Sequence, residues 1–198
     1  MTSSAESAAA PHRWYDADIE RVVVSESDIR DKIAELAKQI DVDYAGADGL
    51  VLVGLFKGAV MFMADLARSL SIPVEMDFMA LSSYGQRVTS SGVVRVLKDI
   101  DADICGRHVL VVEDVVDSGL TLSWLMKYLP TRGPASLEMV SLLRKPKAQA
   151  AGPHVKYIGF DVPDDFLVGY GLDFAERYRE LPFVGVLKPA VYQDQDQD

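Results

Sequence analysis

The sequence has little of what several large classes of protein need. Cys105 is the single cysteine among 198 residues, which excludes a disulfide scaffold and predicts an ordinary, partly buried thiol. Hydrophobic runs are short and interrupted by charge or glycine, so no membrane span is expected. Basic residues are scarce as well: 20 Lys and Arg stand against 30 Asp and Glu, a net charge of −10. This balance argues against binding to nucleic acid or an anionic membrane, but not against an anionic substrate held by metal ions or backbone amides.

The ends of the chain also lack targeting patterns. The N-terminus has no basic leader and no long apolar stretch, so we expect no secretory signal and a cytoplasmic protein. Residues 1–13 are mostly small and polar and are predicted to form a disordered tail. Residues 193–198 form an acidic, low-complexity tail, and residues 14–192 are expected to fold as a single domain, which suits their number.

Between these tails, short apolar segments alternate with amphipathic ones. Segments 50–55 and 108–112 are continuously apolar, as expected of strands that are covered on both faces. Helices are predicted over 25–40, where apolar residues recur on one face, and over 59–70 and 120–129. Strands that alternate with helices predict the α/β class, with a mainly parallel central sheet flanked by helices. Such sheets bind ligands beyond the carboxyl ends of their strands.

The most informative segment is V-L-V-V-E-D-V-V-D-S-G-L-T at 109–121. An apolar strand leads there into three carboxylates, those of Glu113, Asp114 and Asp117. Carboxylates this close repel one another unless a cation lies among them. Mg²⁺ is the expected cation, because it prefers oxygen ligands and shares them with phosphate or sugar oxygens.

A small polar turn follows these carboxylates and opens the next predicted helix. It offers successive backbone N–H groups and two hydroxyls to an anion, and its residues are Ser118, Gly119, Leu120 and Thr121. The Gly-Lys-Ser/Thr ending of a nucleotide P-loop is missing, and so is the dinucleotide fingerprint. The turn and the carboxylates together predict a site for a phosphorylated sugar. The plain alternative is an acidic strand end followed by a capped helix.

This segment resembles the phosphoribosyl-pyrophosphate signature of type I phosphoribosyltransferases, and the chain from about residue 22 to 187 resembles their bacterial hypoxanthine-guanine (6-oxopurine) branch. The resemblance implies the type I fold with a small hood, built mainly from 155–187. It implies Mg²⁺-dependent transfer of the 5-phosphoribosyl group from 5-phosphoribosyl 1-pyrophosphate to N9 of hypoxanthine or guanine, giving IMP or GMP and pyrophosphate. Members of the family are commonly dimers or tetramers, so a homodimer or homotetramer is expected.

Two further segments match loops of that family. In L-F-K-G, Lys57 and Gly58 resemble the loop that binds pyrophosphate, where the peptide bond before the lysine is often cis. From the residues alone, a solvated lysine at a turn is the plain alternative. Ser83 and Tyr84 lie in a polar stretch, 82–92, that resembles the mobile loop that closes over the active site; a long hairpin is the alternative.

The resemblance also assigns base-binding residues. Lys145 would contact the 6-oxo group, and a lysine donates hydrogen bonds but cannot accept them, which favours 6-oxo over 6-amino bases. Phe166 would stack on the purine, and the backbone of Leu167 would bond its edge. Asp173 would hold a second Mg²⁺ and Arg179 would reach pyrophosphate. Without the resemblance, Lys145 would be an ordinary surface lysine, Phe166 a core residue and Asp173 a helix cap.

The implied mechanism gives each charged residue a role. Glu113 and Asp114 would hold the ribose hydroxyls, directly or through Mg²⁺, so Glu113, Asp114 and Asp173 are the predicted metal ligands. Asp117 is the predicted general base, which takes a proton from N7 as N9 attacks or helps to bind that edge. Lys57 would stabilise the departing pyrophosphate. The alternatives are a xanthine-preferring enzyme and a catalytically silent, nucleotide-responsive RNA-binding regulator on the same fold.

Overall fold

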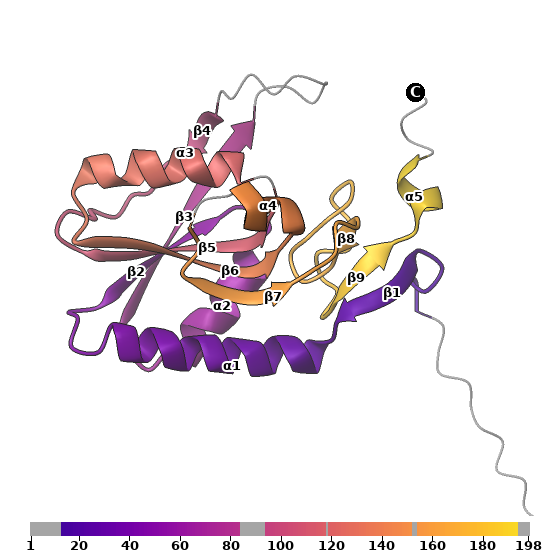
Figure 1. Ribbon diagram of the computed structural model, residues 1–198, viewed down its shortest axis with the longest axis horizontal. Helices are drawn as coiled ribbons and strands as arrows, with labels where there is room; N and C mark the ends of the chain where they lie inside the picture. Colours follow the sequence, from indigo (N-terminus) through magenta and orange to yellow (C-terminus); the bar gives the residue numbers. More distant parts are fainter. Residues whose placement is uncertain (1–12, 84–93, 118, 152–153, 194–198) are drawn as a thin grey trace, which may run out of the picture.

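The computed structural model describes residues 13–83, 94–117, 119–151 and 154–193. Its centre is a six-stranded sheet in the order β4-β3-β2-β5-β6-β7 (Figure 1). These strands are β2 (Leu50–Leu55), β3 (Val74–Ser83), β4 (Val94–Lys98), β5 (His108–Val116), β6 (Ser136–Arg144) and β7 (Tyr157–Asp161). Neighbouring strands are parallel except β3 and β4, which are antiparallel. The predicted α/β class with a mainly parallel sheet is therefore confirmed.

Helices cover both faces of the sheet. They are α1 (Glu26–Asp43), α2 (Val60–Ser69), α3 (Leu120–Tyr128), the 3₁₀ turn η1 (Leu129–Arg132) and α4 (Pro146–Ala151). α1 and α2 pack on one face and α3 on the other. α1 begins at a capping box, in which the Ser25 hydroxyl accepts from the backbone N–H of Asp28 and the Asp28 carboxylate accepts from that of Ser25. None of the described helices is both long enough and apolar enough to cross a membrane.

The side chains of the apolar strands pack into two separate hydrophobic layers, one on each face of the sheet. In β2, Leu50 and Leu52 pack with the residues of α1 and α2, whereas Val51 and Val53 pack with those of α3. β5 alternates in the same way, because successive side chains of a strand point to opposite faces of the sheet. Both faces are covered by helices, and this is why these strands are apolar at every position.

A second, three-stranded antiparallel sheet lies beside the central one. It consists of β1 (Ile19–Val24), β9 (Val184–Leu187) and β8 (Leu167–Val168), in the order β1-β9-β8. We call this sheet the hood, together with residues 169–183 and α5 (Pro189–Gln193). Its strand β1 comes from the N-terminal part of the chain and was not anticipated, while β7, within the C-terminal segment assigned to the hood, pairs with β6 in the central sheet.

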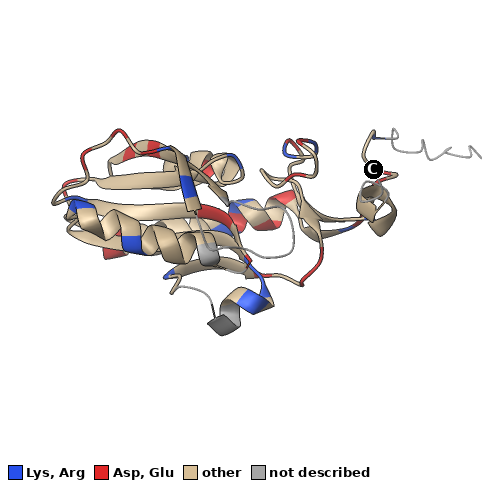
Figure 2. Cartoon of the chain, turned by 90° about the horizontal axis from the view of Figure 1, so that it is seen from above, with Lys and Arg blue, Asp and Glu red and all other residues tan. Residues whose placement is uncertain are grey.

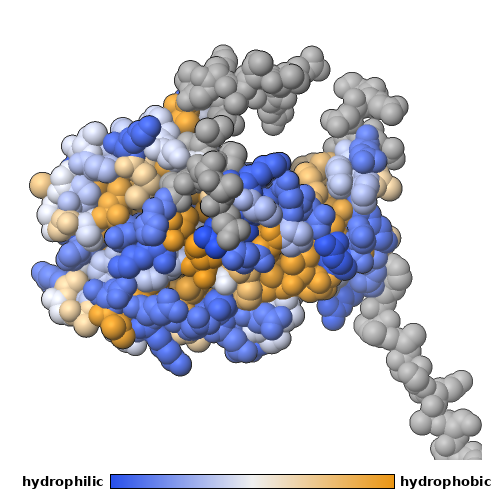
Figure 3. All heavy atoms as spheres, viewed as in Figure 1, coloured by the Kyte–Doolittle hydropathy of each residue, from blue (hydrophilic) through white to orange (hydrophobic). Residues whose placement is uncertain are grey.

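The surface mixes charges of both signs. Figure 2 shows Lys and Arg interspersed with Asp and Glu over the described residues rather than gathered on one side of this view. Figure 3 shows a largely hydrophilic face with an apolar area over the hood, near β8 and β9. Apolar area is also visible over the central sheet, between α3 and α1, so it is not confined to the hood in this view.

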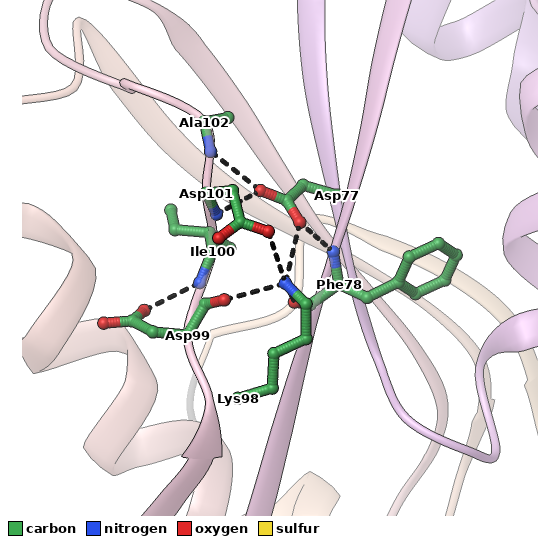
Figure 4. A network of polar contacts seen from close by, with 7 residues as sticks. All are labelled: Asp77, Phe78, Lys98, Asp99, Ile100, Asp101 and Ala102. Atoms are coloured by element: carbon green, nitrogen blue, oxygen red, sulfur yellow. Dashed lines mark hydrogen bonds and ion pairs between the residues drawn. The ribbon is translucent and has the colours of Figure 1, made fainter.

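A partly buried carboxylate joins β3 to the chain around the edge strand β4. Asp77 accepts hydrogen bonds from the backbone N–H groups of Phe78 (2.6 Å), Asp101 (2.7 Å) and Ala102 (2.9 Å), and from Lys98 Nζ (3.3 Å) (Figure 4). Burial on its own would raise the pKa of Asp77, but these donors outweigh burial and hold its pKa below the ordinary value. The network ties β3 to the segment that follows β4.

We expect Asp77→Asn to lower the free energy of unfolding by about 1–3 kcal/mol at neutral pH, because an amide accepts fewer and weaker hydrogen bonds. The pKa of Asp77 is lowered in the folded protein, so its stabilisation is present above the unfolded pKa of about 4 and is lost as the pH falls through the folded pKa. Urea unfolding at pH 7 and pH 3 measures both effects. The difference between wild type and variant should shrink at pH 3, and an equal difference at both pH values contradicts the assignment.

Glu75→Gln is the matched control for this prediction. Glu75 lies on the same strand, but its carboxylate is about half exposed and pairs only with Arg107 at 3.1 Å among the described residues. Exposed ion pairs contribute little. The control is therefore expected to stay within about 0.5 kcal/mol of wild type.

Candidate active site

The two adjacent carboxylates lie inside β5, which extends four residues beyond the predicted strand. Asp117 follows the end of the strand, where its half-exposed carboxylate lies 3.6 Å from Lys145 Nζ. Among the described residues, no three His, Cys, Asp or Glu side chains are grouped to hold a metal ion. The role of Glu113, Asp114 and Asp173 as metal ligands therefore stays a prediction.

Burial dominates the electrostatics of the two strand carboxylates. It raises the pKa of Glu113 well above its ordinary value, with a further increase from the Asp114 charge. It also raises the pKa of Asp114 to about 6, where backbone N–H groups and Arg179 oppose the effect and Asp173 adds to it. The Glu113 Oε2 atom has no hydrogen-bond partner in the described part of the chain. Buried carboxylates without a close cation fit Mg²⁺, which typically binds one or two carboxylates together with substrate phosphates.

The loop after β2 packs against three parts of the molecule. Its Phe56–Lys57 peptide bond is cis. The Phe56 ring stacks on Phe78 of β3, with centroids 4.4 Å apart and planes at 5°. A Cβ added to Gly58 would lie 1.8 Å from Asp114 Oδ2, so only glycine leaves room for that carboxylate. β3 thus contacts Phe56 and β5 contacts Gly58, while the Lys57 side chain between them stays largely exposed.

The hood contacts the same loop, which follows β2, on a third side. Gly171 has a φ of +101°, and a Cβ added there would lie 2.0 Å from the carbonyl oxygen of Gly58. Arg179 holds Gly171 from the other side: its NH1 donates to the Gly171 carbonyl at 2.8 Å, and its own carbonyl accepts from the Gly171 N–H at 2.9 Å. The predicted pyrophosphate ligands Lys57, Gly58 and Arg179 are therefore brought together, although they are more than 120 residues apart in the sequence.

Glu176, which sequence reasoning missed, links the two cations of this group. Its Oε2 atom lies 2.9 Å from Lys57 Nζ and 3.3 Å from Arg179 NH2, and Arg179 NH2 lies 2.9 Å from Asp173 Oδ1. The ion pair with Lys57, followed by that with Arg179, lowers the pKa of Glu176. No motif in the sequence indicated this residue, because the contact with Lys57 spans 119 positions. A carboxylate thus engages the two cations that were predicted to receive pyrophosphate.

We expect Glu176→Gln to lower the KM for 5-phosphoribosyl 1-pyrophosphate by roughly twofold to fivefold, because the uncharged amide no longer competes for the two cations. The effect is modest since the ion pair with Lys57 is more than half exposed and is screened by water. Steady-state kinetics at fixed Mg²⁺ measures it. Glu180→Gln removes the same charge from an exposed hood position with no ion pair among the described residues, and should leave this KM unchanged. A KM that rises in Glu176→Gln but not in Glu180→Gln contradicts the idea that the Glu176 carboxylate competes with the substrate for Lys57 and Arg179.

The predicted base-binding residues surround one small pocket. Its volume is about 100 Å³, and it is lined by Val115, Lys145, Phe166, Leu167, Leu172 and Asp173. Four of these are the residues that the resemblance assigns to the base, from β8, the residue directly before it and the loops after β6 and β8. Val115 and Leu172 were missed, since an apolar residue beside a polar motif carries no signal of its own. Hollows of about 410 and 420 Å³ lie elsewhere and contain none of the predicted site residues.

Lys145 is the charged group of this pocket. Its side chain is mostly buried, and its Nζ lies 3.6 Å from Asp117 Oδ2 and 3.9 Å from Asp164 Oδ1. The backbone N–H of Lys145 donates to the carbonyl of Val116 at 2.9 Å, which fastens the loop after β6 to the end of β5. The end of β5 and the loop after β6 therefore present a carboxylate and an ammonium group side by side at the pocket.

The polar turn after β5 has the predicted form where it is described. Gly119 has a φ of +72°, and α3 begins directly after it at Leu120. No side-chain hydrogen bond from a described residue caps this helix. Ser118 and Tyr84 lie outside the described residues, as do 84–93, while Ser83 ends β3.

Comparisons with known proteins agree with this geometry. The phosphoribosyl transferase domain family matches residues 25–175. The hypoxanthine-guanine phosphoribosyltransferase of Mycobacterium avium is 53% identical over 196 residues, which is 96% of this chain and 97% of that protein. The enzyme of the same name from Bacillus subtilis (strain 168) is 48% identical over 176 residues, 89% of this chain and 97% of that protein.

Solved structures show the same similarity. A hypoxanthine phosphoribosyltransferase from Staphylococcus aureus superimposes with a TM-score of 0.87 at 41% identity, covering 92% of this chain and 99% of that one. The hypoxanthine phosphoribosyl transferase of Trypanosoma cruzi, studied for the role of its C-terminal region in oligomeric state and activity, gives a TM-score of 0.87 at 42% identity. That match covers 94% of this chain and 100% of the other.

Proposed function

The chain belongs to the phosphoribosyltransferase family, in its hypoxanthine-guanine branch, and we propose that it transfers the 5-phosphoribosyl group of 5-phosphoribosyl 1-pyrophosphate to N9 of hypoxanthine or guanine. The products are IMP or GMP and pyrophosphate. The observation that carries this proposal is the pocket in which Lys145, Phe166, Leu167 and Asp173 meet, next to the loop of Lys57. A base site and an anion site thus lie on the same edge of the sheet.

The pair formed by Lys145 and Asp117 suits one edge of a 6-oxopurine. O6 and N7 are neighbours on that edge of guanine. Lys145 would donate a hydrogen bond to O6, and an amino group at the same position, which also donates, would be disfavoured. Asp117, with its carboxylate 3.6 Å from the lysine, would lie at N7 and accept its proton. This edge does not separate hypoxanthine, guanine and xanthine, so a preference for xanthine is the alternative within the same site.

In the reaction, the bond from C1′ to the pyrophosphate oxygen breaks and N9 of the base forms the new bond to C1′. Positive charge develops on the ribose, and negative charge develops on the leaving pyrophosphate. Lys57 and Arg179 would bind that leaving group, and the backbone of the turn at Gly119 would bind the 5′-phosphate. Asp117 would receive the proton that the base gives up, so that the purine ring of the product nucleotide is uncharged.

The residues that would hold Mg²⁺ are Asp173 of the hood and the strand carboxylates Glu113 and Asp114. When bound, Mg²⁺ supplies positive charge against the pyrophosphate oxygens. The two buried carboxylates have raised pKa values, and Asp114 lies against Gly58 of the loop of Lys57, as expected of groups that meet a cation together with a substrate. The ribose hydroxyls would be bound at the same strand end.

We also propose that the enzyme is a homo-oligomer. Large apolar side chains are exposed on Phe56, Met61, Met76 and Leu97, around the start of α2, on β3 and on the edge strand β4. A neighbouring copy of the chain would cover them, since exposed apolar surface commonly marks an interface. Light scattering in solution tests this by comparing the mass with the 21.7 kDa of one chain.

The decisive experiment is a spectrophotometric assay with 5-phosphoribosyl 1-pyrophosphate and Mg²⁺, offering hypoxanthine, guanine, xanthine and adenine separately. Turnover of hypoxanthine and guanine with adenine silent is expected. Turnover of xanthine ahead of both supports the xanthine alternative. Silence with every base contradicts the enzyme and favours a nucleotide-responsive RNA-binding regulator, which salt-dependent RNA binding would then reveal. The mixed charges in Figure 2 do not favour that regulator.

A further inference from the structure

The base-stacking residue is itself packed against an aromatic side chain from the far end of the chain. The Phe166 ring stacks on Tyr192 of α5, with ring centroids 4.9 Å apart and an angle of 20° between the planes. Phe174 contacts the same ring edge-on, at 5.6 Å and 88°. Phe166 is nevertheless more than a third exposed, because these two neighbours do not enclose it. One face of the ring is therefore occupied within the protein and the other is available.

The pocket adjoins Phe166 but not its two aromatic neighbours. Phe166 lines that pocket together with Lys145 and Asp173, whereas Tyr192 and Phe174 do not line it. A planar base that enters beside Lys145 would therefore stack on the side of Phe166 that faces away from Tyr192. The three rings then form a layered arrangement in which the base is the outer layer and Tyr192 the inner one.

The short helix that carries Tyr192 is anchored at the end of the hood sheet where β1 begins and β9 ends. The backbone N–H of Lys188 donates to the carbonyl of Asp18 at 2.9 Å, and its Nζ donates to the carbonyl of Ala17 at 2.5 Å. The backbone N–H of Leu187 donates to the carbonyl of Phe166 at 2.9 Å. Phe166 and Tyr192 are thus connected through β9, and the segment before β1 holds α5 in place (Figure 1).

We propose that Tyr192 is a positioning residue for the base: it holds the Phe166 ring in the plane on which the 6-oxopurine stacks. This inference rests on the proposed function of the site. A partly exposed phenylalanine without a stacking partner can turn to other rotamers, and binding the base would then require ordering it first. Tyr192 removes that requirement by ordering the ring before the base arrives.

The proposal predicts a selective effect on the base. Tyr192→Ala and Tyr192→Leu should each raise the KM for hypoxanthine by roughly threefold to tenfold, which is the range expected for the loss of one aromatic pair. Leucine is the informative variant because it keeps apolar bulk against the hood and removes only the flat surface. Tyr192→Phe should restore the wild-type KM. The KM for 5-phosphoribosyl 1-pyrophosphate should stay within about twofold in all three, because its proposed ligands lie on other elements.

The matched control is Val191→Ala, which removes apolar packing from the same helix turn. Val191 packs against the hood cluster that also includes Tyr192, but it makes no aromatic contact with Phe166. We expect it to change the thermal midpoint and leave the KM for hypoxanthine unchanged.

Two results would overturn the proposal. One is an unchanged hypoxanthine KM in both Tyr192→Ala and Tyr192→Leu. The other is an equal rise in both KM values that Val191→Ala reproduces, since this indicates a general loosening of the hood. A wild-type enzyme that turns over no base refutes the proposed function itself, and that failure is distinguishable because it precedes any comparison of variants.

Discussion

Asp117→Asn is expected to lower kcat by about 10²–10⁴-fold, the usual contribution of a general acid or base. An amide cannot take the proton from the base, whereas the carboxylate that lies 3.6 Å from Lys145 Nζ can. The KM for 5-phosphoribosyl 1-pyrophosphate should change little, because the proposed pyrophosphate ligands Lys57 and Arg179 lie in a different group of contacts. Initial rates with hypoxanthine over a range of both substrates give the two constants separately.

Asp164→Asn is the control for this variant. Asp164 also lies near Lys145, at 3.9 Å, and forms an ion pair with Lys147 at 3.0 Å. The substitution therefore removes a neighbouring carboxylate whose exposure is similar to that of Asp117. The kcat of this variant should stay within about twofold of wild type. Turnover like that of wild type in Asp117→Asn, or an equal loss in both variants, would contradict the role of Asp117.

Gly171→Ala is expected to cost about 2–5 kcal/mol of unfolding free energy together with most of the activity. Two independent penalties add: the φ of +101° strains any side chain, and the new Cβ would lie 2.0 Å from the Gly58 carbonyl oxygen. This is a large share of the 5–15 kcal/mol that stabilises a typical domain. Relief of the clash moves either the hood or the loop of Lys57, so the KM for 5-phosphoribosyl 1-pyrophosphate should rise in whatever protein remains folded.

Gly46→Ala separates these two penalties. Gly46 also has a positive φ, +85°, but an added Cβ there would have no heavy atom within 4 Å. It should therefore cost only about 1–2 kcal/mol and leave the kinetic constants unchanged. Thermal and urea unfolding of the two variants, followed by kinetics at a temperature where both are folded, makes the comparison. Equal losses of stability with unchanged activity in Gly171→Ala would show that the hood does not position the loop.

The parts of the fold that follow local rules could be predicted from the sequence. The alternation of apolar strands and amphipathic helices identified the parallel sheet, because strands covered on both faces must be apolar at every position. The start of α1 agrees with the predicted helix over 25–40, because Ser25 is a residue type that caps helices and its hydroxyl does so here. The turn at Gly119, the acidic strand end and the loop of Lys57 were found because each lies directly after a strand, where parallel sheets carry their sites.

The arrangement of the hood could not be predicted in this way. β1 pairs with β9 through Ile19 and Leu187, which are 168 positions apart, and no local pattern encodes that pairing. The contact of Asp114 with Gly58 could not be predicted either, because it joins β5 to a loop more than 50 positions earlier in the chain.

The amino-acid sequence alone determined the fold class, the family and the residues that follow each strand. Periodicity, turns and short motifs extend over only a few residues, so they can be read without the structure. Only the tertiary structure decided that Glu176 engages Lys57 and Arg179, that Gly171 lies against Gly58, and that Tyr192 lies behind Phe166. These contacts join distant segments. They depend on which surfaces remain to be buried once the sheet has formed, and that is a property of the packed molecule rather than of any segment within it.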